Sequence, residues 1–281
     1  MNERTLITAE ALRALLARGE PVVLLDCGFD LTDAHAGARA YSQGHLPGAR
    51  HADLDHDLSA AKSGRNGRHP LPSREDFADT VARWGVRPET PVVCYDDQGG
   101  AYAARAWWML RWLGHDEVAV LDGGRVAWLA GGGTLESAPA PTSAHAAPYP
   151  LAAASMPTVV ADQLLGLLGK VTLLDARAGE RFRGEVEPLD PVAGHIPGAR
   201  NRFFKDNLQA DGRFRTPAEL RAAFAPYGEP TACVHQCGSG VTACHNLLAL
   251  EHAGLTGARL YAGSWSEWIR DPLRPVATGP Y

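Results

Sequence analysis

Apolar, strand-like runs alternate along the chain with segments in which leucines recur at helical spacing. In the first half, leucines in residues 12–16 precede an apolar run at 22–26 that ends in aspartate. The same order returns in the second half, at 164–168 and 171–175. Strands that alternate with helices are typical of parallel sheets covered by helices. The pattern therefore predicts an α/β fold in which each half forms a parallel sheet flanked by helices on both faces.

A short internal repeat supports this interpretation. Gly-His-Leu-Pro-Gly-Ala-Arg at 44–50 returns as Gly-His-Ile-Pro-Gly-Ala-Arg at 194–200, identical at six of seven positions. A strand-like run opened by proline follows each copy, at 91–95 and 230–234, and a helix-like segment follows each of these. We interpret the chain as a tandem duplication of one α/β unit.

The composition between the two halves indicates where they divide. The stretch 136–156 is rich in Ala, Pro and Ser and nearly lacks large apolar residues, as expected of a linker. We predict an N-terminal domain at 1–135 and a C-terminal domain at 157–281.

One cysteine stands in a context that favours chemistry. Cys237 lies in His-Gln-Cys-Gly-Ser-Gly-Val-Thr-Ala, residues 235–243, between a strand-like run and a helix-like run that Gly254 stops. The glycines on either side of Ser239 let the backbone turn tightly and aim N–H groups inward, and the positive end of the helix favours the thiolate. The alternative is a small buried apolar residue, a common place for cysteine. The context favours a nucleophile.

The first half differs from the second between the repeated motif and the position that corresponds to Cys237. The offset between the copies falls from 150 residues at the repeated motif to 139 at the prolines, so the first half has 11 extra residues in or near 59–72. At an offset of 139, Gln98 takes the place of Cys237. We therefore predict one reactive thiol for two domains, with the first half supplying a wall of the site.

Charge and cysteine content narrow the partners and the compartment. The chain has 27 Lys and Arg against 32 Asp and Glu, a net charge of −5, and no basic run, so neither nucleic acid nor an anionic membrane is expected as a partner. Five cysteines form no even-numbered disulfide framework, which favours the reducing cytoplasm. The N-terminus resembles no secretory signal, and no run is long enough to span a membrane.

The cysteines suggest two other uses, a metal site and phosphoryl chemistry. No usual zinc spacing is matched by Cys233, His235, Cys237, Cys244 and His245, so no metal site is predicted. A cysteine phosphatase needs an arginine that closes the loop around phosphate, whereas Ala243 stands there. Phosphoryl chemistry is therefore disfavoured.

Three motifs together resemble the tandem rhodanese-type sulfurtransferases, and within them the 3-mercaptopyruvate sulfurtransferases: the paired Gly-His-x-Pro-Gly-Ala, the loop at 237–243, and Tyr-Ala-Gly-Ser-Trp-Ser-Glu-Trp at 261–268. The resemblance implies a cofactor-free reaction in which Cys237 takes sulfur from a donor, holds it as a persulfide, and passes it to cyanide or to a thiol such as reduced thioredoxin. Converging backbone N–H groups would hold the anionic persulfide. The loop residues assigned to this binding role are Gly238, Gly240, Val241 and Thr242.

The resemblance also implies a proton relay and a carboxylate site. Ser239 matches the serine of a Ser-His-Asp relay, His69 in His-Pro-Leu-Pro matches its histidine, and Asp55 matches its aspartate. Asp53 and Asp57 are equally placed by sequence for the last role.

Arg181 matches the first of two arginines that bind the substrate carboxylate. The second follows about nine residues later in many members, but this chain reads Glu-Pro-Leu-Asp-Pro at 187–191. Arg183 or a residue from the first half could take its place.

The sequence is compatible with three functions. The loop after Cys237 is neutral and offers no salt bridge to a sulfonate, which favours mercaptopyruvate over thiosulfate as the donor. Thiosulfate:cyanide sulfur transfer by the same thiol is the first alternative. A non-catalytic module that accepts persulfide from a partner protein and relays it is the second.

Overall fold

The alternating strands and helices fold into two parallel sheets, one in each of two compact units. A computed structural model describes residues 4–138 and 149–280, so residues 139–148 of the predicted linker lie outside the described part, and the division at 136–156 stays a prediction. Neither unit is contiguous in sequence. Unit 1 contains Met1–Ser59, Pro72–Ser155 and Ala210–Phe214, and unit 2 contains Ala60–Leu71, Met156–Gln209 and Arg215–Tyr281.

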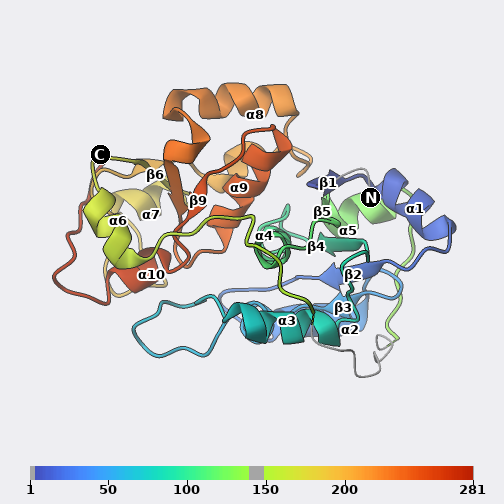
Figure 1. The fold of residues 1–281 in the computed structure, drawn as a ribbon. Coiled ribbons are helices and arrows are strands. Elements are labelled where there is room, and N and C mark those ends of the chain that lie inside the picture. The colour runs from blue at the N-terminus through green and yellow to red at the C-terminus, as the bar shows by residue number, and fades with distance from the viewer. Residues whose placement is uncertain (1–3, 139–148, 281) are drawn as a thin grey trace. The chain divides into compact units, whose positions relative to one another are not determined.

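The sheet of unit 1 has five parallel strands in the order β1-β5-β4-β2-β3 (Figure 1). The central strands are short, buried on both faces and rich in valine and leucine, as expected of a parallel sheet covered by helices. The strands are β1 (Leu6–Ile7), β2 (Val23–Asp26), β3 (Arg50–His51), β4 (Val92–Tyr95) and β5 (Val118–Leu121).

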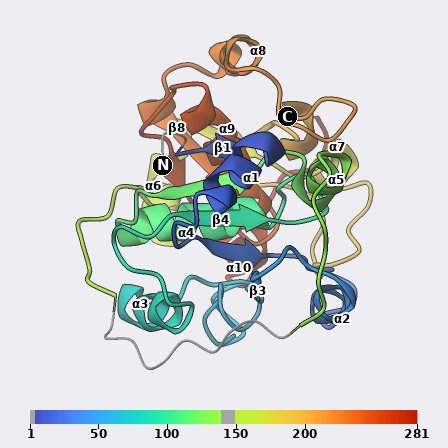
Figure 2. The same cartoon turned by 90° about the vertical axis from the view of Figure 1, so that its right-hand side faces the viewer.

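Helices cover both faces of this sheet. Leu12 of α1 and Trp128 of α5 pack against Leu24 and Val93 on one face, and α4 covers the other. Figure 2 shows α1 and α3 on opposite sides of the β4 arrow. The helices of unit 1 are α1 (Ala9–Ala17), α2 (Ala36–Gln43), α3 (Arg74–Arg83), α4 (Ala103–Leu113) and α5 (Gly124–Ala130).

The sheet of unit 2 has four parallel strands in the order β7-β6-β8-β9. These are β6 (Thr172–Asp175), β7 (Arg200–Asn201), β8 (Cys233–Gln236) and β9 (Arg259–Leu260). The strand expected at 230–234 begins only at Cys233, because Pro230–Ala232 forms a 3₁₀ turn instead. Proline has no N–H for the strand ladder and a φ that suits this turn.

Helices also cover both faces of the second sheet (Figure 1). Leu164 of α6, Phe182 of α7 and Trp265 of α10 pack on one face, while α8 and α9 lie on the other. The elements are α6 (Ala161–Leu167), α7 (Gly179–Arg183), α8 (Pro217–Phe224), α9 (Thr242–His252) and α10 (Ser264–Trp268), with 3₁₀ turns η1 (Phe204–Asn207), η2 (Ala225–Tyr227) and η3 (Pro230–Ala232). The predicted fold class is confirmed. Among the described helices, none combines the length and the apolar character needed to cross a membrane.

The histidines of the repeated motif make equivalent contacts in the two units. Each is fully buried, and its Nδ1 lies 2.8 Å from a backbone oxygen, that of Tyr41 for His45 and that of Phe182 for His195. Each ring also stacks on the aromatic ring of the same residue, with centroids 3.9 Å apart. These contacts show that each histidine packs within the core of its own unit.

Candidate active site

The Cys237 loop lies where strand and helix of unit 2 meet. Cys237 directly follows β8, an inner strand, and the chain enters α9 at Thr242. The carboxyl ends of parallel strands form the usual ligand-binding edge of such a sheet. Only 2% of the cysteine is exposed, so its thiol is shielded from bulk solvent.

The loop requires a glycine at position 240. Gly240 has a φ of +76°, in the left-handed region, and a Cβ placed on it would overlap the carbonyl oxygen of Ala262. Two backbone hydrogen bonds tie the loop to the segment beyond β9: Trp265 N–H donates to the oxygen of Cys237 at 3.0 Å, and Ser266 N–H donates to that of Gly238 at 2.9 Å. The loop is therefore held by the packed segment at 261–268.

Ser264 is part of this anchoring, and sequence reasoning assigned it no role. Its Oγ accepts a hydrogen bond from Cys237 N–H at 3.0 Å and donates one to the oxygen of Tyr261 at 2.9 Å. Its φ is +54°, uncommon for a residue other than glycine, and the side chain is fully buried. The motif at 261–268 contained this serine, but its strained backbone is visible only in the fold.

The loop residues predicted to bind substrate lie at the start of α9. Gly238 and Gly240 belong to the turn, Val241 is the N-cap of α9, and Thr242 is its first residue. The first N–H groups of a helix have no partner within the helix, and the helix dipole adds partial positive charge there. This end of α9 therefore favours an anion, and the role of these four residues stays a prediction.

Two members of the predicted relay meet in unit 2. His69 belongs to the segment Ala60–Leu71, which is part of unit 2, and its Nδ1 lies 2.7 Å from Oγ of Ser239. Both side chains are buried, with 4% of His69 and 5% of Ser239 exposed. A hydrogen-bonded Ser-His pair two residues from a thiol has the geometry of a proton relay.

The third member of the predicted relay belongs to the other unit. Asp55 is half-buried in unit 1, where its N–H donates to Oδ1 of Asp53 at 2.8 Å. Asp53 also accepts from the N–H of His56, and Asp57 accepts from the N–H of Asp53. The carboxylates of Asp53 and Asp57 therefore cap a local turn, whereas that of Asp55 makes neither of these bonds. Its part in a relay stays a prediction.

Arg181 lies in α7 with its guanidinium beside the loop. A Cβ placed on Gly238 would lie 3.6 Å from its Nη2. The same Nη2 donates to Oε1 of Glu187 at 2.6 Å and lies 3.7 Å from Oδ2 of Asp190. About a fifth of the side chain, 18%, is exposed, so this cation is accessible to a ligand.

Arg177, four residues before Arg181, is also an arginine of this region, and it is buried. Arg177 pairs with Asp175 at 2.7 Å and with Glu187 at 3.4 Å, and its guanidinium lies over the Trp265 ring, 5.0 Å from the ring centroid. Burial opposes its charge, but Asp175 and Glu187 outweigh burial and raise the pKa of Arg177, with a smaller contribution from Cys237. The guanidinium is thus a fixed positive charge within electrostatic reach of the thiol.

The counterpart of Cys237 in unit 1 is Asp96, so the prediction of Gln98 is wrong. Tyr95 pairs with Asp26 across the first sheet as Gln236 pairs with Asp175 across the second, which aligns the residues that follow each strand. The residues 96–102 separate β4 from α4, two more than the residues 237–241 that separate β8 from α9. Pro91 directly precedes β4, whereas the 3₁₀ turn Pro230–Ala232 precedes β8, so an alignment on the prolines misplaces the residues after the strands by two.

In unit 1, the loop that corresponds to the Cys237 loop surrounds the side chain of Asp96. Its carboxylate accepts four backbone N–H bonds of 2.8–2.9 Å, from Gln98, Gly100, Tyr102 and Ala103. Complete burial raises the pKa of Asp96, and the four hydrogen bonds oppose that shift. The loop at the start of α4 thus surrounds a carboxyl group with N–H donors, at the position that the thiol occupies in unit 2.

His235, two residues before Cys237, gives β8 a titratable core group. It is fully buried, and neither ring nitrogen has a hydrogen-bond partner among the described residues. Burial, with a further contribution from the charge of Arg202, lowers the pKa of His235 to about 3. The imidazole is therefore neutral in the folded protein at neutral pH.

We expect His235 to make unfolding depend on pH. The unfolded state takes up the proton near pH 6.5 and the folded state only near 3, so the contribution to stability is complete above 6.5 and is lost as the pH falls. Between pH 6.5 and 5 this group should lower the free energy of unfolding by about 2 kcal/mol. Urea unfolding of wild type and His235→Leu at both pH values measures this difference. The exposed His56→Leu should keep the wild-type pH dependence, and a variant of His235 that keeps it too would contradict the assignment.

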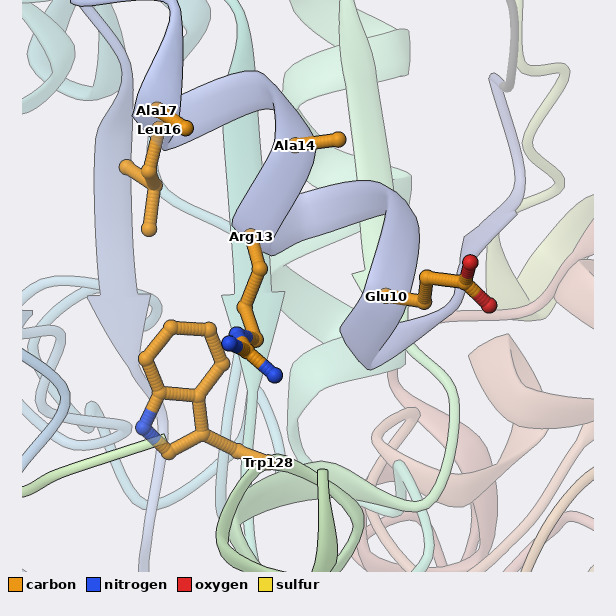
Figure 3. A pocket seen from close by; sticks show the side chains of 6 residues that line it. All are labelled: Glu10, Arg13, Ala14, Leu16, Ala17 and Trp128. Atoms are coloured by element: carbon orange, nitrogen blue, oxygen red, sulfur yellow. The ribbon is translucent and has the colours of Figure 1, made fainter. Parts of the chain in front are cut away.

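Neither a surface pocket beside α1 nor a metal-binding cluster competes with the Cys237 loop in the described residues. A surface pocket of about 540 Å³ lies between α1 and Trp128 of α5, with the Arg13 guanidinium beside the indole ring (Figure 3). Its lining lacks cysteine, histidine and serine, and it contains none of the predicted site residues. Within residues 4–138 and 149–280, no group of three or more His, Cys, Asp or Glu side chains is placed to hold a metal ion.

Comparison with known proteins identifies the family. Residues 8–131 and 160–271 each match the rhodanese-like domain. The chain is 52% identical to a probable 3-mercaptopyruvate sulfurtransferase of Pseudomonas aeruginosa over 99% of this chain and all of the relative. It is 44% identical to the putative thiosulfate sulfurtransferase SseB of Mycobacterium tuberculosis over 98% of each chain. The 3-mercaptopyruvate sulfurtransferase of Leishmania major has the same fold, with a TM-score of 0.84 and 33% identity over 97% of this chain and 75% of that one. The chain therefore belongs to the tandem rhodanese-domain sulfurtransferases.

Proposed function

We propose that this protein transfers sulfur from 3-mercaptopyruvate to an acceptor through a persulfide on Cys237. The observation that carries the proposal is the buried pair of His69 and Ser239, 2.7 Å apart and two residues from the thiol. Mercaptopyruvate needs a proton to be moved during sulfur transfer, and thiosulfate does not. A relay beside the nucleophile therefore supports the keto-acid donor, as does the likeness to the relatives with that name.

The first step transfers one sulfur atom and one proton. The Cys237 thiolate attacks the sulfur of mercaptopyruvate, the S–S bond forms, and the C–S bond breaks with its electron pair moving to carbon. The leaving group is the enolate of pyruvate. The proton of the substrate thiol reaches that carbon through Ser239 and His69, so that anionic persulfide and pyruvate are the products.

The loop is suited to stabilising the product of this step. The persulfide is an anion, and it would lie at the N-terminus of α9, near the N–H groups of Gly238, Gly240, Val241 and Thr242. Asp96 provides an internal parallel, since the corresponding loop of unit 1 binds a carboxylate with four N–H donors. Stabilisation of the same charge in the transition state would accelerate transfer.

The second step returns the enzyme to its thiolate. Cyanide attacks the outer sulfur and leaves as thiocyanate. A dithiol such as reduced thioredoxin also attacks the outer sulfur; it then forms its own disulfide and releases hydrogen sulfide.

All five cysteines lie in the described part of the chain and none forms a disulfide, which agrees with a reducing compartment such as the cytoplasm.

Donor preference tests the proposal directly. Wild-type protein should release pyruvate from mercaptopyruvate in the steady state with a higher kcat/KM than it shows for thiosulfate. The likeness to SseB makes thiosulfate the alternative donor, and a preference for it of tenfold or more would overturn the proposal. Uptake of persulfide without turnover of either donor would instead indicate a sulfur relay.

Replacing His69 should separate the two donors. We expect His69→Ala to slow pyruvate formation by about 10²-fold or more, because the enolate then lacks its proton relay. Thiosulfate turnover should fall much less, since sulfite leaves without protonation at carbon. Steady-state kinetics with both donors measures the split, with the exposed His56→Ala as the control. Equal losses on both donors would argue against a role in proton transfer.

A further inference from the structure

Two guanidinium groups, not one, lie beside the loop at Gly238. A Cβ placed on this glycine would lie 2.8 Å from Nη2 of Arg68 and 3.6 and 3.7 Å from Nη2 and Nη1 of Arg181. Arg68 comes from the segment Ala60–Leu71 and Arg181 from α7, and both belong to unit 2. Gly238 directly follows Cys237, so both cations lie beside the residue next to the reacting cysteine.

Arg68 is held in this position by several contacts. Its guanidinium forms an ion pair with Asp190, and its backbone N–H donates to Oγ of Ser266 at 3.0 Å. The preceding Gly67 has a φ of +83°, and a Cβ there would lie only 3.0 Å from both the oxygen of Gly263 and Oγ of Ser266. The close approach to residues 263–266 fixes the start of the Arg68 side chain, and Asp190 fixes its end.

Asp190 serves as a counter-ion to both arginines. Its side chain is 1% exposed; one oxygen pairs with Arg68, and the other lies 3.7 Å from Nη2 of Arg181. Glu187 holds the turn, since its Oε1 accepts from the N–H of Asp190 at 3.2 Å as well as from Arg181. A single buried carboxylate thus places two guanidinium groups side by side.

The two arginines differ from Arg177 in their exposure. The side chains of Arg68 and Arg181 are 20% and 18% exposed, whereas that of Arg177 is 1% exposed and is bonded to Asp175. A ligand that enters from solvent can therefore reach the first two but not the third. The three arginines and the acids Asp175, Glu187 and Asp190 balance in charge, so an entering anion meets no net negative cluster.

We propose that Arg68 binds the carboxylate of the keto-acid donor together with Arg181. This inference rests on the proposed function and names a residue that the sequence did not single out. Position 190, nine residues after Arg181, carries an aspartate where the resemblance leads one to expect a second arginine. Asp190 pairs instead with a guanidinium from another part of the chain. The planar fork of one arginine can meet both carboxylate oxygens while the other donates to one of them.

Removal of this guanidinium should weaken binding more than chemistry. We expect Arg68→Ala to raise the KM for mercaptopyruvate and the inhibition constant for pyruvate by about 10- to 100-fold, with a smaller change in kcat. Pyruvate serves as the unreactive carboxylate probe. Arg68→Lys retains a cation that can pair with Asp190, and should give a smaller increase. Arg65→Ala, an exposed arginine of the same segment, should behave as wild type.

The outcomes separate this inference from the proposed function. If wild type releases no pyruvate from mercaptopyruvate, the proposed function fails. If it does, and both Arg68 variants keep the wild-type KM and pyruvate inhibition, the inference on Arg68 is overturned. Sulfite, the anion released from thiosulfate, tests whether Arg68 binds a carboxylate in preference to a sulfur oxyanion. Arg68→Ala should weaken inhibition by pyruvate more than inhibition by sulfite, and the opposite order would also overturn the inference.

Discussion

Cys237→Ala is expected to abolish sulfur transfer from mercaptopyruvate and from thiosulfate alike, with a loss of at least about 10⁴-fold in kcat/KM. The loss should be this large because both half-reactions pass through the same sulfur, and unit 1 carries Asp96 rather than a thiol at the corresponding position. Steady-state release of pyruvate and of thiocyanate measures the two reactions. Intact mass adds a direct readout, since wild type treated with donor should gain about 32 mass units and the variant should not.

The neighbouring cysteines provide matched controls for this substitution. Cys233 in β8 and Cys244 in α9 are as buried as Cys237 and lie within seven residues of it. Burial raises the pKa of Cys233, which disfavours its thiolate. Cys233→Ala should therefore keep both the turnover and the gain in mass. A gain in mass that persists in Cys237→Ala would move the carrier role to another cysteine.

Arg177→Met should produce the largest loss of stability, about 3–5 kcal/mol in the free energy of unfolding of unit 2. The guanidinium bonds Asp175 through three contacts of 2.7–3.1 Å and donates to the oxygen of Gly194 at 2.8 Å. Methionine would fill much of the volume but would leave Asp175 and Glu187 as buried carboxylates without this counter-ion. Urea unfolding followed by tryptophan fluorescence measures the loss.

An exposed arginine of the same region tests whether burial is the cause. Arg183 of α7 pairs with Glu185 at 2.7 Å, but this pair is open to solvent. Exposed ion pairs contribute little, so Arg183→Met should unfold close to wild type. Similar losses for Arg177→Met and Arg183→Met would show that the buried carboxylates are not responsible.

Much of the fold could be predicted from local pattern. The apolar runs ending in Asp26 and Asp175 are β2 and β6, and the stretch after Cys237 is a helix that ends before Gly254, as predicted. Such elements follow from side-chain periodicity over a few residues. The start of β8 was misplaced, because the proline that opens the run begins a 3₁₀ turn rather than the strand.

Local pattern alone could predict the candidate site only where its residues share one short motif. The loop around Cys237 and Ser239 could be recognised in nine consecutive residues. The resemblance selected His69, and the structure places it 2.7 Å from Ser239 although 170 residues separate them. The chemical roles of both residues remain predictions, as does that of Asp55 in unit 1.

By itself, the sequence determined the duplication, the α/β class and the single loop cysteine, because these depend on periodicity and on residues close together in the chain. Only the tertiary structure decided that Asp96 is the counterpart of the thiol, because strand register reveals an insertion that an alignment on prolines does not. It alone paired Arg68 with Asp190, 122 residues apart, and exposed the strained backbone of Ser264. Ion pairs and backbone strain arise from packing between distant segments, and no local pattern of side chains records them.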